Sequence, residues 1–303
     1  MPLCYIKEDS PWPARVKENA IGWLALVTLV PLLLWTNLIQ TLSALAIPLA
    51  PNRVRRLNRW LANLWWTLCA QYTRHFGKVE VRVSGHDVPE DENAILLCNH
   101  QSMSDITVLF ELGLRKGRLG DLKWFVKDVL KWVPGIGWGM LFLDCLFVKR
   151  NWTQDKASIA ATFKRIVDNK VPVWVVSFAE GTRMTPAKGA SSREFAASRG
   201  YPQLQHVLLP RTKGVVATVE GLGDHLDAIY DLTIGYTKAI PTLWQWTKGL
   251  APVVHLHVRR WPREEVPTEA EALASWLVQR YADKDQLLAG FYESGEFASS
   301  ESS

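Results

Sequence analysis

An imidazole and a carboxylate five residues apart are the first candidates for chemistry in this sequence. His100 follows the apolar run 94–98 and Asn99, and Asp105 comes five residues after it. Histidine has the unperturbed pKa closest to neutrality, which makes it the usual general base. A carboxylate that binds one ring nitrogen leaves the other nitrogen free to accept a proton. The pair therefore predicts proton-transfer chemistry.

The spacing restricts where this pair can lie. In a regular helix five residues turn the chain by about 140°, so the two side chains would point apart. They can meet only if His100 lies in the turn before a helix that begins at Ser102 or Ser104, both suitable N-caps. A histidine in a capped loop is common without any catalytic role, so the pair needs a neighbouring substrate site to be informative.

A second cluster of polar residues follows the most apolar segment of the chain, residues 171–178. This segment delivers Glu180, Gly181, Thr182 and Arg183 at its carboxyl end, which is where ligands bind in open α/β sheets. Glycine permits an unusual backbone angle, and the planar guanidinium of arginine suits phosphate. The segment therefore predicts an anion-binding turn.

Two further segments place polar residues where we expect strands to end. Lys149 and Arg150 close the segment 146–150, and Pro210 closes the apolar segment 205–210. Each is weak evidence alone, because basic residues are common on protein surfaces. Together with Arg183, the pair Lys149–Arg150 strengthens the prediction of a phosphate site.

The elements that must position these residues alternate between strands and helices from about residue 76. We expect helices over 102–113, 153–169, 215–228 and 267–290, and a polar loop before residue 205. Strands are expected over 79–83, 94–98, 121–127, 146–150, 171–178, 205–210, 229–236 and 251–261. This alternation predicts an α/β domain with a mostly parallel or mixed sheet flanked by helices.

The N-terminal quarter has a different character. Residues 20–50 contain no Asp, Glu, Lys or Arg and are long enough to cross a bilayer or to enter it as a short hairpin around Pro31. A signal peptide or a buried soluble helix are the alternatives. Residues 57–72 follow a helical period and predict an amphipathic helix, either at the lipid interface or in the soluble core. No element is predicted over residues 1–19.

We therefore divide the chain into three parts. Residues 1–75 are expected to form a membrane anchor and interfacial helix, 76–292 the catalytic domain, and 293–303 a disordered tail. The arginines that follow the apolar segment predict a cytoplasmic domain, since such residues mark the cytoplasmic side; they are Arg53, Arg55, Arg56 and Arg59.

The amino-acid composition indicates which classes of partner the protein is expected to bind. The net charge of +5 and pI of about 9.0 favour a polyanionic partner, and fifteen Trp residues favour a membrane surface over nucleic acid, for which no recognition motif is present. The four Cys are scattered, which fits a reducing compartment. His255 and His257 would share one face of a strand, but without further ligands nearby we expect no metal site.

The motifs, taken in order, resemble those of the 1-acylglycerol-3-phosphate acyltransferase (PlsC-like) family of glycerolipid acyltransferases. Asn99, Ser102 and the His100–Asp105 pair match its N-H-x-S-x-x-D block. Residues 180–183 match E-G-T-R, 147–150 the arginine-bearing block, and 209–210 the proline-bearing block. The resemblance covers about residues 85–260. Longer segments such as 119–140 look like the lysocardiolipin and lysophosphatidylglycerol acyltransferase branch, in a compact bacterial form.

This resemblance implies a membrane-bound enzyme that moves an acyl group from acyl-CoA or acyl-carrier protein to a lysophospholipid hydroxyl, without another cofactor. His100 would be the base and Asp105 its orienting partner. The expected substrate-binding residues are Arg150, Glu180, Gly181, Thr182 and Arg183, and the expected supporting residues are Asn99, Ser102, Lys149 and Pro210. The sequence does not identify the oxyanion donor, for which a backbone N–H near His100 or Gly181 is the candidate. The expected location is the cytoplasmic side of a bacterial inner membrane.

Two other functions remain open at this point. One is a lipid hydrolase with Ser102 as its nucleophile, although the chain lacks the G-x-S-x-G motif that marks many such enzymes. The other is a lipid-binding protein without catalytic activity.

Overall fold

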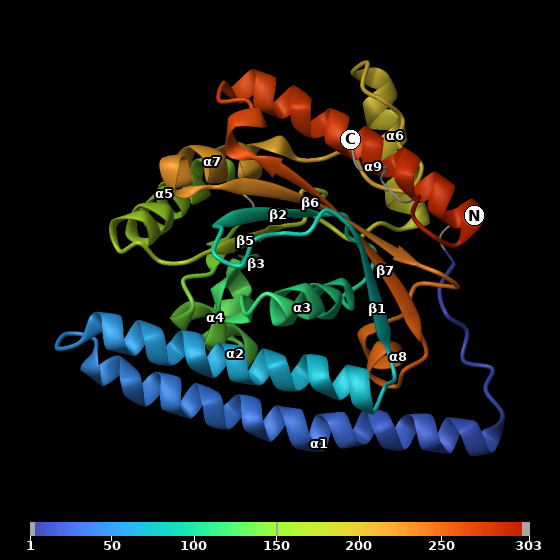
Figure 1. Ribbon diagram of the computed structural model, residues 1–303, viewed down its shortest axis with the longest axis horizontal. Coiled ribbons are helices and arrows are strands. Elements are labelled where there is room, and N and C mark those ends of the chain that lie inside the picture. Colours follow the sequence, from blue (N-terminus) through green and yellow to red (C-terminus); the bar gives the residue numbers. More distant parts are fainter. Residues whose placement is uncertain (1–3, 150, 299–303) are drawn as a thin grey trace.

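One mixed sheet forms the centre of the molecule (Figure 1). The computed structural model describes residues 4–149 and 151–298. Seven strands within these ranges follow the spatial order β1-β7-β6-β2-β5-β3-β4, and only the β6–β7 pair is antiparallel. The strands are β1 Glu80–Gly85, β2 Ala94–Cys98, β3 Leu122–Lys127, β4 Leu146–Val148, β5 Trp174–Ser177, β6 Ala228–Tyr236 and β7 Val253–Pro262. The prediction of an α/β domain with a mixed sheet is confirmed.

Helices cover both faces of this sheet. Helices α5, α7 and α9 lie on one face, whereas α3 lies on the other with α1 and α2 beyond it (Figure 1). The helices are α1 Trp12–Ser43, α2 Pro51–His75, α3 Asp105–Arg115, α4 Ile136–Phe142, α5 Trp152–Asp168, α6 Pro186–Ser198, α7 Thr212–Leu222, α8 Leu243–Thr247 and α9 Ala270–Ser294. Short 3₁₀ turns are η1 Ala44–Ala46, η2 Leu119–Asp121, η3 Asp128–Trp132, η4 Gly223–His225 and η5 Arg263–Glu265.

Strand β2 is buried on both sides, which explains its uninterrupted apolar sequence. Leu96 and Cys98 pack into the core beneath α3, whereas Ile95 and Leu97 pack into the core beneath α5 and α9. Because β2 lies between β5 and β6, the residues that follow it emerge at the middle of the carboxyl edge of the sheet.

The expected strand over residues 205–210 does not form. Backbone N–H groups of residues 205–207 donate to the Asp285 carboxylate on α9, and those of Leu208 and Leu209 donate to Glu180 and to the Ser192 hydroxyl. These side chains satisfy the backbone donors that a sheet would otherwise satisfy. Pro210 therefore follows an irregular segment, and the prediction that it closes a strand is wrong.

The polar loop expected before residue 205 contains a helix, α6. Pro186 occupies its first turn, where a missing N–H costs nothing, and the Thr185 hydroxyl accepts from the N–H of Lys188 as an N-cap. Its sequence has little apolar periodicity, and most of its residues are small or polar. The start signals were present, but the periodic pattern that identifies a surface helix was not.

Helix α1 begins at Trp12, within the stretch where no element was predicted. Pro11 is its N-cap, and a proline stands in the first turn, where its fixed backbone angle favours a helix start. Pro31 lies inside the helix without dividing it. The chain reverses over residues 44–50, and α2 returns beside α1, with Trp65 Nε1 donating to the Leu29 carbonyl at 3.1 Å.

The tail is ordered further than expected. Residue 294 ends α9, and Phe297 is buried, with its ring stacked on Phe291 at 4.5 Å between centroids. The predicted disorder from residue 293 is therefore wrong up to residue 298. Residues 299–303 lie outside the described part of the chain.

Candidate active site

His100 and Asp105 meet in the turn between β2 and α3. His100 Nδ1 lies 2.9 Å from Asp105 Oδ2, Ser104 is the N-cap residue of α3, and Asp105 is its first residue. The predicted geometry, in which the histidine precedes the helix and the aspartate occupies the first turn, is confirmed. The His100 side chain is 13% exposed, whereas the Asp105 side chain is fully buried, so solvent reaches the imidazole and not the carboxylate.

Asp105 is held by more donors than the histidine alone. Its Oδ2 accepts the backbone N–H groups of Gln101 at 2.7 Å and Ser102 at 2.8 Å, and its Oδ1 accepts the Tyr236 hydroxyl at 2.6 Å. Hydrogen bonds to a carboxylate favour its ionised form. The carboxylate therefore holds the ring with Nδ1 as the donor, which leaves Nε2 to accept a proton.

Strand register brings Glu180 to the same turn. In the parallel β2–β5 pair, Leu97 lies opposite Ser177, so His100 and Glu180 each stand three residues beyond that pair. The His100 N–H donates to Glu180 Oε1 at 2.8 Å, and the Leu208 N–H donates to Glu180 Oε2 at 3.2 Å. Glu180 is buried, and this burial raises its pKa to about 8. Glu180 therefore positions the histidine turn, and its expected role in substrate binding stays a prediction.

The turn that follows Glu180 presents cations to solvent. Gly181 has a φ of +69°, and a methyl group there would stand 2.9 Å from Arg211 Cδ, so the Arg211 side chain crosses over this turn. Thr182 Oγ1 accepts from Lys188 Nζ at 2.6 Å. The Arg183 side chain is exposed. Among the described residues no carboxylate pairs with Arg183, which leaves its guanidinium available to an anion.

Neighbouring strands add lysines at the same edge. Lys127 ends β3 opposite Val148, the last residue of β4, and Lys149 follows directly; both lysines are exposed. Arg150, which the sequence predicts at this place, lies outside the described residues. The Lys149 N–H donates to Asp155 of α5 at 2.8 Å, so this carboxylate orders the backbone at the strand end. Lys127 was not identified from the sequence.

The two supporting residues of the histidine motif are structural. The buried Asn99 side chain pairs with the backbone of Ile234 in both directions, at 2.8 Å and 3.0 Å, and so extends the β2–β6 pairing by one residue. The Ser102 hydroxyl is buried and donates to the Pro241 carbonyl, and it accepts from Ser104. A serine held in this way is not presented to the His100 ring, which argues against Ser102 as a nucleophile.

The N–H groups of His100 and Gly181 are both engaged within the protein. The His100 N–H donates to Glu180, and the Gly181 N–H donates to the Phe178 carbonyl at 2.9 Å. Neither of these two N–H groups points freely toward a reacting carbonyl, and a donor among the neighbouring backbone N–H groups stays a prediction. The Phe178 ring stacks on the His100 imidazole at 4.1 Å between centroids and covers one of its faces.

A buried lysine, also unpredicted, supports the strand ends beneath the site. Lys284 of α9 lies 2.6 Å from Asp231 Oδ1 and donates to the Leu232 carbonyl at 2.6 Å. It falls on the buried stripe of α9, which also holds Leu277, Tyr281 and Leu288. A charged residue in register with such a stripe is the signal that could have identified it.

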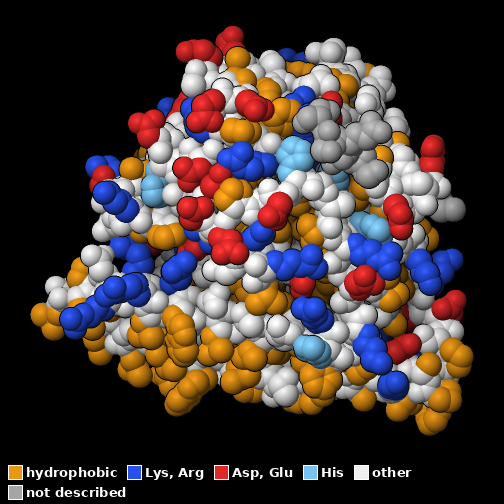
Figure 2. All heavy atoms as spheres, viewed as in Figure 1, with side chains coloured by type: hydrophobic (Ala, Val, Ile, Leu, Met, Phe, Trp, Pro, Cys, Tyr) orange, Lys and Arg blue, Asp and Glu red, His pale blue; other side chains and the backbone are white. Residues whose placement is uncertain are grey.

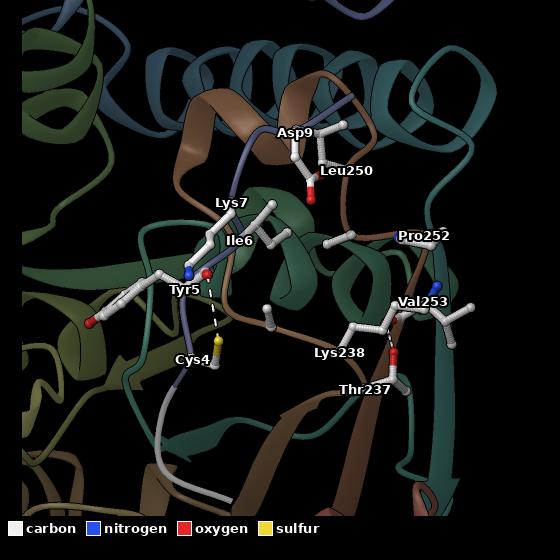
Figure 3. Close-up of a pocket in the computed structure, with 12 residues that line it drawn as sticks. Cys4, Tyr5, Ile6, Lys7, Asp9, Thr237, Lys238, Leu250, Pro252 and Val253 are labelled. Atoms are coloured by element: carbon white, nitrogen blue, oxygen red, sulfur yellow. Dashed lines mark hydrogen bonds between the residues drawn. The ribbon is translucent and has the colours of Figure 1, made fainter. Parts of the chain in front are cut away.

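A segment from the N-terminus also reaches the site. Residues 4–9 cross the loop after β6, where Tyr5 pairs with Ile240. The Tyr5 hydroxyl donates to the Met184 carbonyl at 3.4 Å, and the Met184 N–H donates to the His100 carbonyl at 2.7 Å. A cavity lies between this segment and the start of β7, as Figure 3 shows. Its volume is about 300 Å³. Neither His100 nor the 180–183 turn lines this cavity, so it is separate from the candidate site.

Comparisons with known proteins agree with the site. Residues 80–237 match the family model described as Acyltransferase, and residues 248–303 match Acyltransferase C-terminus. The chain is 35% identical over 258 residues to "Probable 1-acyl-sn-glycerol-3-phosphate acyltransferase 5" of Arabidopsis thaliana, covering 84% of this chain and 69% of that protein. It is 32% identical over 271 residues to "1-acyl-sn-glycerol-3-phosphate acyltransferase gamma" of Homo sapiens, covering 86% of this chain and 71% of that protein.

A solved structure supports the fold. The crystal structure of the 1-acyl-sn-glycerophosphate (LPA) acyltransferase, PlsC, from Thermotoga maritima superposes with a TM-score of 0.56 at 16% identity, covering 91% of this chain and 98% of that one. At this identity the likeness concerns architecture. Together with the family match over residues 80–237 and the identity to the plant and human proteins, it leads to one conclusion. The chain belongs to the PlsC-type acyltransferase family and is an acyltransferase.

Proposed function

We propose that this enzyme transfers an acyl group from an acyl thioester to the free hydroxyl of 1-acylglycerol-3-phosphate at a membrane surface. The observation that carries the proposal is the buried Asp105 carboxylate holding the partly exposed His100 ring at 2.9 Å. The names of the plant and human relatives favour this acceptor.

The transfer needs one base and no acyl-enzyme. His100 Nε2 removes the proton of the acceptor hydroxyl as its oxygen attacks the thioester carbonyl. The tetrahedral intermediate collapses with cleavage of the carbon–sulfur bond, and the imidazolium returns the proton to the departing thiolate. The products are the diacyl phospholipid and the free thiol of CoA or acyl-carrier protein.

The cations at the carboxyl edge of the sheet supply the acceptor's phosphate site. Arg183 is exposed in the turn beside His100, Arg211 crosses that turn, and Lys127 and Lys149 extend the edge. A guanidinium binds phosphate in a planar, bidentate manner. Arg150 belongs to the same proposed site on the basis of its motif.

We further propose that the protein lies in the plane of one leaflet. By length and composition, residues 12–46 form a helix that could cross a membrane. However, it contacts the domain along its length: Trp23 packs on Trp244 of α8, Leu29 accepts from Trp65, and Leu33 lies against Gly135. A helix held at successive turns can offer lipid only its outer face.

The outer face fits this attachment. Figure 2 shows hydrophobic side chains gathered along the edge formed by α1 and α2. Six exposed tryptophans lie on or beside these helices, and tryptophan favours the lipid–water interface; they are Trp12, Trp23, Trp35, Trp60, Trp132 and Trp138. Membrane helices and catalytic turn thus belong to one packed unit.

We also propose the side of the membrane and the family branch to which the enzyme belongs. Placement of the domain on the cytoplasmic side is supported by the arginines at the start of α2, of which Arg59 pairs with Asp121 in the domain; the bacterial inner membrane is proposed with it. The lysocardiolipin or lysophosphatidylglycerol branch is supported by the sequence segments described above. Lysocardiolipin and lysophosphatidylglycerol are therefore the alternative acceptors.

Mass spectrometry of products tests the proposal directly. Purified enzyme in mixed micelles receives a panel of lysolipids with acyl-CoA and, separately, with acyl-carrier protein. We expect the largest kcat/KM with 1-acylglycerol-3-phosphate. A preference for lysophosphatidylglycerol or lysocardiolipin would reassign the acceptor, and release of free fatty acid without acyl transfer would indicate the hydrolase.

A further inference from the structure

Tyr236 completes the hydrogen bonding of the catalytic carboxylate. It is the last residue of β6, and its side chain is buried. Its hydroxyl donates to Asp105 Oδ1 at 2.6 Å and lies 3.0 Å from Ser104 Oγ. Strand β6 continues four residues beyond Leu232, the partner of Cys98 at the end of β2, so its end reaches the first turn of α3.

The hydroxyl remains a donor throughout the working pH range. Burial, and then the adjacent Asp105 carboxylate, raise the pKa of Tyr236 well above its usual value. Asp105 Oδ2 receives three donors, whereas Tyr236 is the one donor to Oδ1 among the described residues. Loss of this hydroxyl would leave a buried carboxylate oxygen without a partner, which is costly.

We propose that Tyr236 is a positioning residue for acyl transfer: it orients the Asp105 carboxylate and limits how strongly this carboxylate stabilises the His100 imidazolium. The inference rests on the proposed role of His100 as the base. A carboxylate that shares its charge with a hydroxyl donor stabilises a neighbouring cation less than one without it. Removal of the Tyr236 hydroxyl would therefore strengthen the interaction between the Asp105 carboxylate and the imidazolium.

Other ionisable groups also lie near the catalytic turn. Glu180 accepts the His100 N–H, and Tyr292 of α9 accepts from the Gln101 side chain at 2.9 Å. Further ionisable groups lie beneath the strand ends among the described residues, and they include Lys284, Asp231, Tyr281 and the Cys98 thiol. Each of these remains in the variants proposed below, so a change in pH dependence can be assigned to position 236.

The test is the pH profile of kcat/KM for Tyr236→Phe. We expect kcat to fall about tenfold to a hundredfold, KM for both substrates to change less than twofold, and the acid limb to move to higher pH. An unmoved acid limb would overturn the proposal, even with lower activity, because a merely structural role lowers activity without changing the profile.

Tyr230→Phe is a matched control on the same strand. Tyr230 is also buried, and its hydroxyl donates to a carboxylate, Glu92, at 2.6 Å, far from His100 at the other end of β6. This variant should lose folding stability but keep the wild-type pH profile. An equal shift of the acid limb in Tyr230→Phe would overturn the assignment to Tyr236.

A second variant keeps the proposal testable if the phenylalanine protein misfolds. Tyr236→3-fluorotyrosine retains the size and hydroxyl, and its more acidic phenol is a stronger donor. The acid limb should then move to lower pH, opposite to the phenylalanine variant. An unchanged limb in the folded fluorotyrosine protein would overturn the inference.

His100→Ala distinguishes a failure of the proposed base from a failure of the role proposed for Tyr236. Activity that survives this substitution would remove the proposed base and with it the inference. Activity lost in His100→Ala together with an unmoved acid limb in Tyr236→Phe would overturn the role of Tyr236 alone.

Discussion

The backbone N–H of His100 donates to the buried carboxyl group of Glu180, 2.8 Å away and 80 residues later in the chain. This bond joins the two motif blocks of the site from within the protein. Because Glu180 also accepts the N–H of Leu208, one carboxylate connects three loops at the carboxyl edge of the sheet. The glutamate of the E-G-T-R block thus shapes the site, and its arginine is the residue that faces solvent.

His100→Ala should lower kcat by about a hundredfold to ten-thousandfold, the usual contribution of a general base. Acyl transfer measured at saturating thioester checks this. His225→Ala serves as control, since His225 Nε2 contacts the Val171 carbonyl away from the site. A loss below tenfold in His100→Ala would remove the proposed role of the base.

Glu180 should make folding stability fall as pH rises. Its pKa, which burial raises from 4.5 to about 8, means that the folded chain keeps a proton that the unfolded chain loses between these values. Stability from this group is therefore complete below about pH 4.5 and is lost as pH approaches 8. The free energy of unfolding, measured with urea at several pH values in this range, should fall as pH rises, and the substitution Glu180→Gln should make this fall less steep. Parallel slopes in the two proteins would contradict the expectation.

Glu180→Gln should also lower activity. Its amide group places an N–H₂ against one of two backbone N–H donors, so one of these donors loses its acceptor, at a cost of about 1–3 kcal/mol. Because the glutamate does not face the substrate, kcat should fall more than either KM rises. A selective rise in the acceptor KM would mean that Glu180 binds substrate after all.

Arg183→Ala should raise the KM for the lysolipid about tenfold or more, as expected for loss of a charge-assisted phosphate contact, with a smaller change in the thioester KM. Steady-state kinetics with each substrate varied in turn measures both. Arg199→Ala is the control, since Arg199 caps the far end of α6. A larger effect on the thioester KM would place the lysolipid phosphate elsewhere.

Trp132→Asp should weaken binding to phospholipid vesicles by roughly tenfold, because burial of a large apolar side chain contributes about 1.5–3 kcal/mol. Trp132 is 75% exposed beside α4. Phe195→Asp, at a 52% exposed position on α6 across the sheet from α1, should bind like the wild type. Equal vesicle binding by all three proteins in a flotation assay would exclude the proposed lipid-facing surface.

Local spacing was enough to predict the pairing of His100 with Asp105, because a strand end and a helix start lie within seven residues of each other. The sheet class also followed from the order of apolar segments. In contrast, the expected strand over 205–210 was apolar in sequence, yet its N–H groups bind Asp285, Ser192 and Glu180. Only the tertiary arrangement brings those acceptors to it.

The residues that the sequence did not identify reach the site because of how neighbouring strands are aligned in the sheet. Tyr236 reaches Asp105 because β6 extends past the end of β2, and Lys127 lies beside the end of β4, next to Lys149, because β3 extends that far. Neither relation is visible in spacing along the chain. That the N–H groups of His100 and Gly181 are engaged within the protein was hidden for a similar reason, since their acceptors become known only when the turns are folded.

The continuous packing of α1 against the domain has a consequence for membrane growth. An enzyme held in one leaflet takes its acceptor from that leaflet and leaves the diacyl product in the same place. New phospholipid would then accumulate on one side of the bilayer and strain it by unequal areas. Under the proposed placement in one leaflet, the opposite leaflet would expand only if lipids crossed the bilayer, which would require a separate transbilayer lipid carrier.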